Sequence, residues 1–240
     1  MLYNNIHIKL AFKDLYMIYL ILLGLLFFIQ LFAASWYDLA KKATDKKKAF
    51  KHKLICSAIY MASVLLCSAI KGNFNNTYTL LFIGAFLSIF IHDIVEEKSN
   101  KFHSVFSAIL SVVGYIAIAV ALCYKNLILL NQNQISLIIK YAIPAVVFLI
   151  CAITLIKSVS VSLLIATVYL IICAILTGIT LHKSGNPQSQ AASCAIIMGA
   201  TAIFFSSIIS VFDKNNTKSL LRINLYYFGL MFISCSVAVV

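Results

Sequence analysis

The chain of 240 residues is 62% hydrophobic and only 11% charged, and its mean hydropathy is +1.00. A soluble domain is about half apolar and about a quarter charged, so this composition excludes a water-soluble fold and predicts a chain embedded in lipid. The formal net charge of +12 does not indicate nucleic-acid binding, because no folded polar surface interleaves the basic residues with aromatic ones.

Apolar stretches recur along the whole chain, each long enough to cross a bilayer as a helix. They show no alternation of apolar and polar residues, so we expect helices rather than the strands of a membrane barrel. The sequence therefore predicts an all-α, polytopic integral membrane bundle of about eight transmembrane helices, forming a single domain over residues 1–240 with a faint four-plus-four repeat. The predicted spans are Leu15–Ala34, Leu54–Ile70, Tyr78–Val95, Val105–Leu122, Ser136–Leu155, Val161–Leu181, Ala192–Phe212 and Ile223–Val240.

The first span follows Lys9 and Lys13, but it is too long for a signal peptide and no A-x-A-like cleavage site follows it. Basic residues in alternate loops number thirteen on one side of the predicted membrane and six on the other. Cytoplasmic loops carry the excess of Lys and Arg, so both termini are expected outside, although Lys9 and Lys13 favour the opposite orientation. High Lys, Ile and Asn usage suits a bacterium, and we expect its cytoplasmic membrane as the location.

Two further features bear on helix shape and packing. Pro144, in the fifth span, predicts a local kink. Small residues at helical spacing, including Gly84 in the third span and Gly199 in the seventh, predict close contacts between helices. Seven cysteines occur singly without CxxC spacing, and no nucleotide or metal motif is present, so we expect neither a metal nor an organic cofactor.

Asp93 is the one carboxylate that the apolar stretches enclose, because the other acidic residues are expected in loops or at helix margins. An ionisable group inside the membrane is a candidate functional residue. His92 and Asp93 lie near the cytoplasmic end of their span, however, so a structural pair at the interface, matched with a lysine, is an equal alternative.

Other polar residues are predicted at the same membrane level as Asp93. Lys53 opens the second span, Ser206 and Ser207 lie late in the seventh, and Tyr226 lies near the start of the eighth. Tyr115 and Tyr169 are expected nearer the middle of the membrane. A phenol there needs a hydrogen-bond partner, so both are candidates to line a cavity, with aromatic packing as the alternative.

The helix count and these residues resemble the YhhN family, eight-helix lysoplasmalogenases that hydrolyse the vinyl ether bond of lysoplasmalogens. The resemblance runs from about Lys53 to the C terminus. Lys53 matches the lysine of a Lys-Pro motif, Asp93 the aspartate of a Gly-Asp motif, Tyr115 the tyrosine of a His-x-x-Tyr motif and Tyr169 a tyrosine of the sixth helix. The best local match is the segment 199–207, which ends in Ser206-Ser207 where the family has Ser-Asp.

The resemblance implies a hydrolase whose partner is a membrane lipid or lysophospholipid. Asp93 is then the acid/base residue, Lys53 contacts the phosphate, and a cavity is lined by His92, Tyr115, Tyr169, Ser206, Ser207 and Tyr226. Since Ser207 replaces one of two family carboxylates, Asp93 has to act with Lys53, a tyrosine or water. Two alternatives remain open: a non-catalytic relative that binds or transports a lipid, and a bundle with a structural role.

Overall fold

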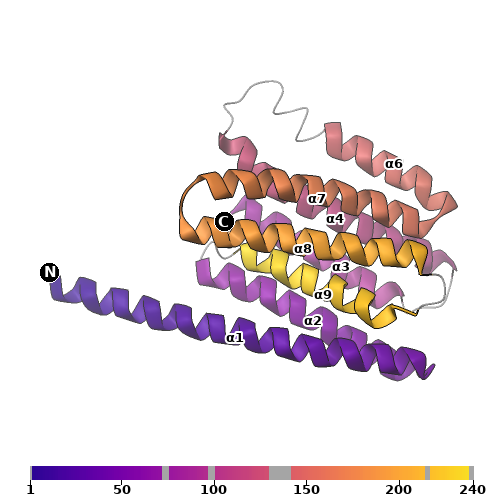
Figure 1. The fold of residues 1–240 in the computed structure, drawn as a ribbon, viewed down its shortest axis with the longest axis horizontal. Helices are drawn as coiled ribbons and strands as arrows, with labels where there is room; N and C mark the ends of the chain where they lie inside the picture. Colours follow the sequence, from indigo (N-terminus) through magenta and orange to yellow (C-terminus); the bar gives the residue numbers. More distant parts are fainter. Residues whose placement is uncertain (1, 72–75, 97–100, 130–141, 214–216, 238–240) are drawn as a thin grey trace.

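The computed structural model describes residues 2–71, 76–96, 101–129, 142–213 and 217–237, and all of its regular structure is helical (Figure 1). Six of the described helices contain a segment long and apolar enough to cross a membrane, which confirms a helical, multi-pass membrane bundle. The eight helices within the described ranges are α1 (Leu2–Lys42), α2 (Lys46–Lys71), α3 (Thr77–Glu96), α4 (Lys101–Leu129), α6 (Ile143–Lys157), α7 (Val159–Lys183), α8 (Pro187–Phe212) and α9 (Ser219–Ser236).

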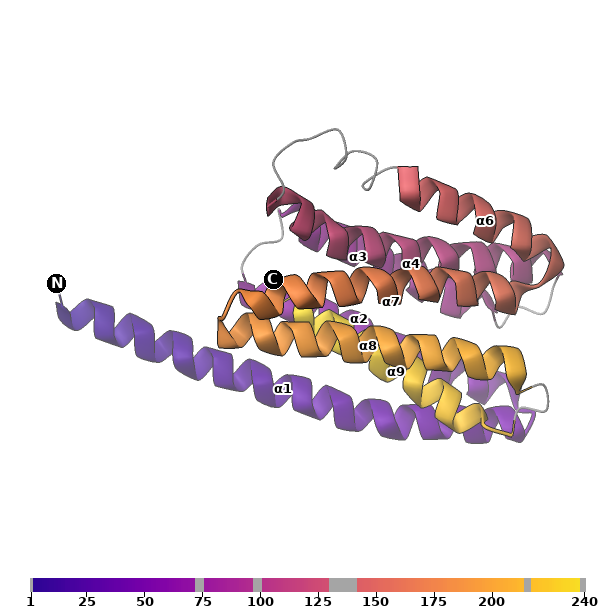
Figure 2. The same ribbon diagram turned by 45° about the horizontal axis from the view of Figure 1, so that its top comes forward.

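Six helices pack in a closed ring, in the order α2, α3, α4, α7, α8 and α9, with α9 returning to α2. The other two helices cover junctions of this ring. α1 packs against α2 and α9, and α6 packs against α4 and α7 on the opposite side of the bundle (Figure 2). Side chains from several helices can therefore meet inside the ring.

The surface of the bundle is apolar and several polar groups are buried, the reverse of a soluble protein. On α1, Ile21, Phe28 and Phe32 are 59%, 66% and 62% exposed. Inside, by contrast, Lys53 and Asp93 are each only 2% exposed. This distribution is expected when lipid chains surround the helices and polar groups find their partners within the protein.

Capping hydrogen bonds fix two of the turns between helices. The Asp45 carboxylate accepts the backbone N–H of Lys48 at 3.1 Å, and this bond is the main cause of its lowered pKa. Between α8 and α9, Asp213 accepts the backbone N–H of Lys218 at 2.6 Å and that of Thr217 at 3.0 Å, which likewise lowers the pKa of Asp213. These turns hold α2 beside α1 and α9 beside α8.

A close helix contact involves Gly199 of α8 and Gly229 of α9. A Cβ atom at either position would lie 2.7 Å from the carbonyl oxygen of the other, so only glycine permits this approach. The expected close contact at Gly199 is thus confirmed. Gly84 is different: it is exposed, and within the described part of the chain no atom lies within 4 Å of where its Cβ would be, so it makes no such contact.

The fifth predicted span differs from the structure. α6 begins at Ile143, with Pro144 in its first turn, where the missing N–H has no intrahelical acceptor to lose. Pro144 therefore lies in the first turn of the described helix, and the predicted kink, which involves the residues before it, stays a prediction. Residues 136–141 of the predicted span, and residues 238–240 of the last one, lie outside the described residues.

Candidate functional site

A cavity of about 130 Å³ lies at the end of the bundle where α1, α3 and α8 end and α2, α7 and α9 begin, on the right in Figure 1. Seven helices contribute to it, and Leu163 and Ile223 are its only aliphatic lining residues among those described. Lys41, Lys53 and Arg222 bring positive charge to its wall, and Asp93 and Glu96 bring carboxylates. A polar cavity inside an apolar membrane bundle is a candidate functional site.

The Asp93 carboxylate is held from two other helices. Ser57 Oγ and Tyr60 OH of α2 donate to its Oδ2 at 2.6 and 3.2 Å, and Tyr226 OH of α9 donates to its Oδ1 at 3.2 Å. Lys53 Nζ lies 3.9 Å from Oδ1. Both oxygens are thus engaged by donors, and the side chain is fixed in one position at the cavity wall.

Lys53 lies between two carboxylates, because its ammonium group is hydrogen-bonded to Glu96 as well as being near Asp93. The Lys53 side chain is 3% exposed, whereas that of Glu96 is 55% exposed. Glu96 was expected in a loop or at a helix margin, and α3 does end at Glu96. Because Glu96 follows Asp93 by three residues, both carboxylates lie on one face of the helix, and both line the cavity.

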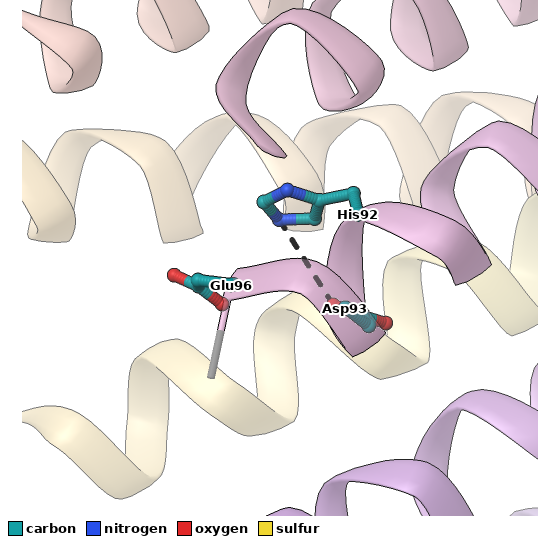
Figure 3. Close-up of side chains that lie close together, drawn as sticks. All are labelled: His92, Asp93 and Glu96. Atoms are coloured by element: carbon teal, nitrogen blue, oxygen red, sulfur yellow. Dashed lines mark ion pairs between the residues drawn. The ribbon is translucent and has the colours of Figure 1, made fainter. Parts of the chain in front are cut away.

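The imidazole of His92 is oriented by Ser107 of α4. Its Nδ1 lies 2.8 Å from the Ser107 carbonyl oxygen and 2.7 Å from Ser107 Oγ, while its Nε2 lies 4.0 Å from Asp93 Oδ1. The bond to the carbonyl requires a proton on Nδ1, which leaves Nε2 facing Asp93. Figure 3 shows the His92–Asp93 pair with Glu96 beside it at the end of α3.

His92, Asp93 and Glu96 each place a possible metal-ligand atom within 4.8 Å of the others. The ammonium group of Lys53 already lies between the two carboxylates of this group, hydrogen-bonded to Glu96 and 3.9 Å from Asp93. A metal ion would have to displace that buried cation, so the arrangement fits an internally paired cluster better than a metal site.

Seven of the residues predicted from the sequence meet at this cavity. They are Lys53, His92, Asp93, Tyr115, Ser206, Ser207 and Tyr226. Ser206 Oγ donates to the Arg222 carbonyl oxygen at 3.0 Å and so links α8 to α9, whereas Ser207 Oγ donates to Ile203 of its own helix at 3.1 Å.

Tyr169 does not line the cavity, although it was predicted to do so. It is half-buried and packs against the hydrophobic core, while α7 reaches the cavity through Ser160 and Leu163. Successive helical residues are rotated by about 100°, so Tyr169, six positions after Leu163, points to a different side of α7.

Sequence reasoning missed several partners of Asp93. Ser57 and Tyr60 follow Lys53 by four and seven residues, which places all three on one face of α2. That periodicity was a usable signal for both residues. Lys41 and Arg222, by contrast, had been assigned only to the charged loops, yet both line the cavity.

Comparison with protein-family models, with curated proteins and with solved structures gave no match.

Proposed function

We propose that this chain is a YhhN-like membrane hydrolase that cleaves the vinyl ether bond of lysoplasmalogen-type lysophospholipids. The observation that carries the proposal is the setting of Asp93: a buried carboxylate, hydrogen-bonded by three hydroxyl groups, at the wall of a polar cavity within an apolar bundle. The reaction needs a proton donor and an anion that stabilises a developing cation, and both kinds of group line the cavity.

The cationic part of the wall suits the phosphate of a lysophospholipid. Lys41, Lys53 and Arg222 approach the cavity from three helices, and Ser206 and Ser207 add hydroxyl groups. In this arrangement the headgroup binds at the polar end of the bundle and the single hydrocarbon chain lies along the apolar helices.

The proposal includes eight membrane crossings in a bacterial cytoplasmic membrane, with the cavity at the cytoplasmic end. α9 supports this count because Tyr227, Leu230 and Met231 are almost completely buried within the bundle. α6 is a shorter apolar helix that packs outside α4 and α7.

Single cysteines introduced at Asp45 and at Gly185, in turns at opposite ends of the bundle, test the orientation. Labelling of Gly185→Cys but not of Asp45→Cys from outside intact cells is expected, and the reverse pattern would invert it.

The activity is tested with purified protein in lipid nanodiscs and a lysoplasmalogen substrate, by measuring released fatty aldehyde. The matched control substrate is the saturated 1-alkyl lysophospholipid, which has the same headgroup and chain but no alkene carbon to protonate. Aldehyde from the alkenyl substrate alone is the expected result. No aldehyde from folded protein would overturn the hydrolase proposal.

A lipid-binding or transport function is the second candidate, and Ser207 is the observation that favours it. Its hydroxyl bonds to its own helix and supplies no fixed charge where the family has an aspartate. If the protein binds the alkenyl and the alkyl lipids equally and cleaves neither, the lipid-binding function replaces the hydrolase.

A further inference from the structure

We propose that Glu96 is the proton donor of this site and that Asp93 is the fixed anion that stabilises the cationic intermediate. This inference rests on the proposed hydrolase function and assigns its two chemical roles to two different carboxylates. The YhhN family has a second carboxylate at the position of Ser207 in α8. In this chain Glu96 of α3 provides a second carboxylate at the cavity instead.

Asp93 is poorly placed to exchange protons with water. It is 2% exposed, and hydroxyl groups from α2 and α9 donate to both of its oxygens. A group that donates a proton in each turnover has to recover one from water. Asp93 would have to break these hydrogen bonds to do so, which makes it a poor proton carrier.

Glu96 is accessible to water, whereas Asp93 is buried. Its side chain is 55% exposed, lines the same cavity and lies on the same face of α3. The charged or titratable groups that line this cavity with it include Lys41, Lys53, His92, Asp93 and Arg222. Lys53 binds Glu96 in the structure, so a substrate phosphate that binds Lys53 adds a negative charge beside Glu96 and favours proton uptake by it.

The proton balance of the reaction closes with Glu96 alone. The Glu96 carboxylic acid transfers its proton to the alkene carbon remote from the ether oxygen, and the C=C electrons leave an oxocarbenium ion beside the Asp93 carboxylate. Water adds to the cationic carbon to form a hemiacetal, and one proton of this water passes to the Glu96 carboxylate. The hemiacetal then breaks its bond to the glycerol oxygen, and its hydroxyl proton passes to that oxygen, which releases fatty aldehyde and the free glycerol hydroxyl. The net change is the consumption of one water.

The test compares Glu96→Gln, Glu96→Ala and Asp93→Ala in the aldehyde-release assay, with Asp45→Asn as the control that removes a carboxylate outside the cavity. Glu96→Gln should lower the rate at least about a hundredfold. Added formate should restore part of the activity of Glu96→Ala, because a small acid can enter an exposed position. It should not restore Asp93→Ala to the same extent, because the Asp93 side chain is only 2% exposed. Thermal unfolding of each variant verifies that it is folded.

Two results would overturn the inference while leaving the proposed function intact. One is a folded Glu96→Gln variant that works at the wild-type rate. The other is rescue of Asp93→Ala by formate without rescue of Glu96→Ala. A folded wild-type protein that releases no aldehyde overturns the proposed function, and this inference with it.

Discussion

Two buried aspartates at the same end of the bundle differ in what they face. Asp38 of α1 and Asp93 of α3 are both 2% exposed, both lie near a lysine and both accept a hydrogen bond from a serine. Asp38 is paired with Lys42 of its own helix at 2.7 Å and with Ser219 at the start of α9, and it does not line the cavity. Asp93 lines the cavity.

The comparison separates a structural carboxylate from a candidate working one. Burial and a lysine partner are common to both, so neither feature identifies a site. Asp38 joins α1 to the first residue of α9 and so stabilises helix packing. Contact with a polar cavity, shared with a second carboxylate, is what singles out Asp93.

The largest expected effect is that of Asp93→Asn. The amide keeps the shape of the side chain but removes its fixed negative charge, so aldehyde release should fall at least about a hundredfold while the fold persists. Asp38→Asn is the matched control: it should lower the unfolding free energy by about 1 kcal/mol and leave turnover unchanged, because Lys42 is exposed and Ser219 keeps an oxygen acceptor. Equal loss of activity in both variants would contradict the distinction between the two aspartates.

A smaller effect is expected from Ser57→Ala, which removes the shortest hydroxyl bond to Asp93, at 2.6 Å. A hydrogen bond to a charged group contributes about 1.5 kcal/mol, so turnover should fall roughly tenfold if Asp93 acts through its fixed position. Ser63→Ala on the same helix is the control, because Ser63 Oγ donates only to the Ile59 carbonyl oxygen at 3.0 Å. If the two variants have the same activity, the Ser57 bond does not matter for the chemistry.

The smallest effect is expected at Asp213, whose carboxylate lies in the turn before α9 and does not line the cavity. Its pKa is lowered, chiefly by the backbone N–H of Lys218, below the ordinary value of 3.8. A lowered pKa in the folded state means that its contribution to stability is present above the unfolded pKa and is lost as the pH falls through the folded one. The melting temperature should therefore fall less steeply with acid in Asp213→Asn than in wild type. Parallel curves would show that this turn contributes no pH dependence.

The sequence predicted which residues lie near one end of the bundle, but not the rotation of every helix. From their positions within the apolar stretches, Lys53, Asp93, Ser206 and Tyr226 were expected at one level, and all four line the cavity. Which way a side chain points depends on the neighbouring helices, which the sequence does not reveal. Tyr169 was a candidate to line the cavity because a phenol within the membrane needs a hydrogen-bond partner, but it does not line the cavity.

Other differences come from the ends of the apolar stretches. Glu96 was expected in a loop or at a helix margin, and α3 does end there, but its side chain also lines the cavity beside Lys53, which the sequence analysis missed. Asp38 was likewise assigned to a margin, although it is buried. The side chain of a charged residue just past an apolar stretch can pack against the bundle when a residue of opposite charge lies nearby. Hydropathy alone does not reveal that partner.

The most direct test of the hydrolase proposal is the isotope content of the aldehyde formed in D₂O. If the site protonates the alkene carbon, wild-type protein should release fatty aldehyde with one deuterium on the carbon next to the carbonyl, because the donor exchanges with solvent. The background from enolisation is measured by incubating unlabelled aldehyde with Asp93→Asn under the same conditions. Aldehyde without deuterium above that background, or no aldehyde at all, would contradict acid-catalysed hydrolysis of a vinyl ether at this cavity.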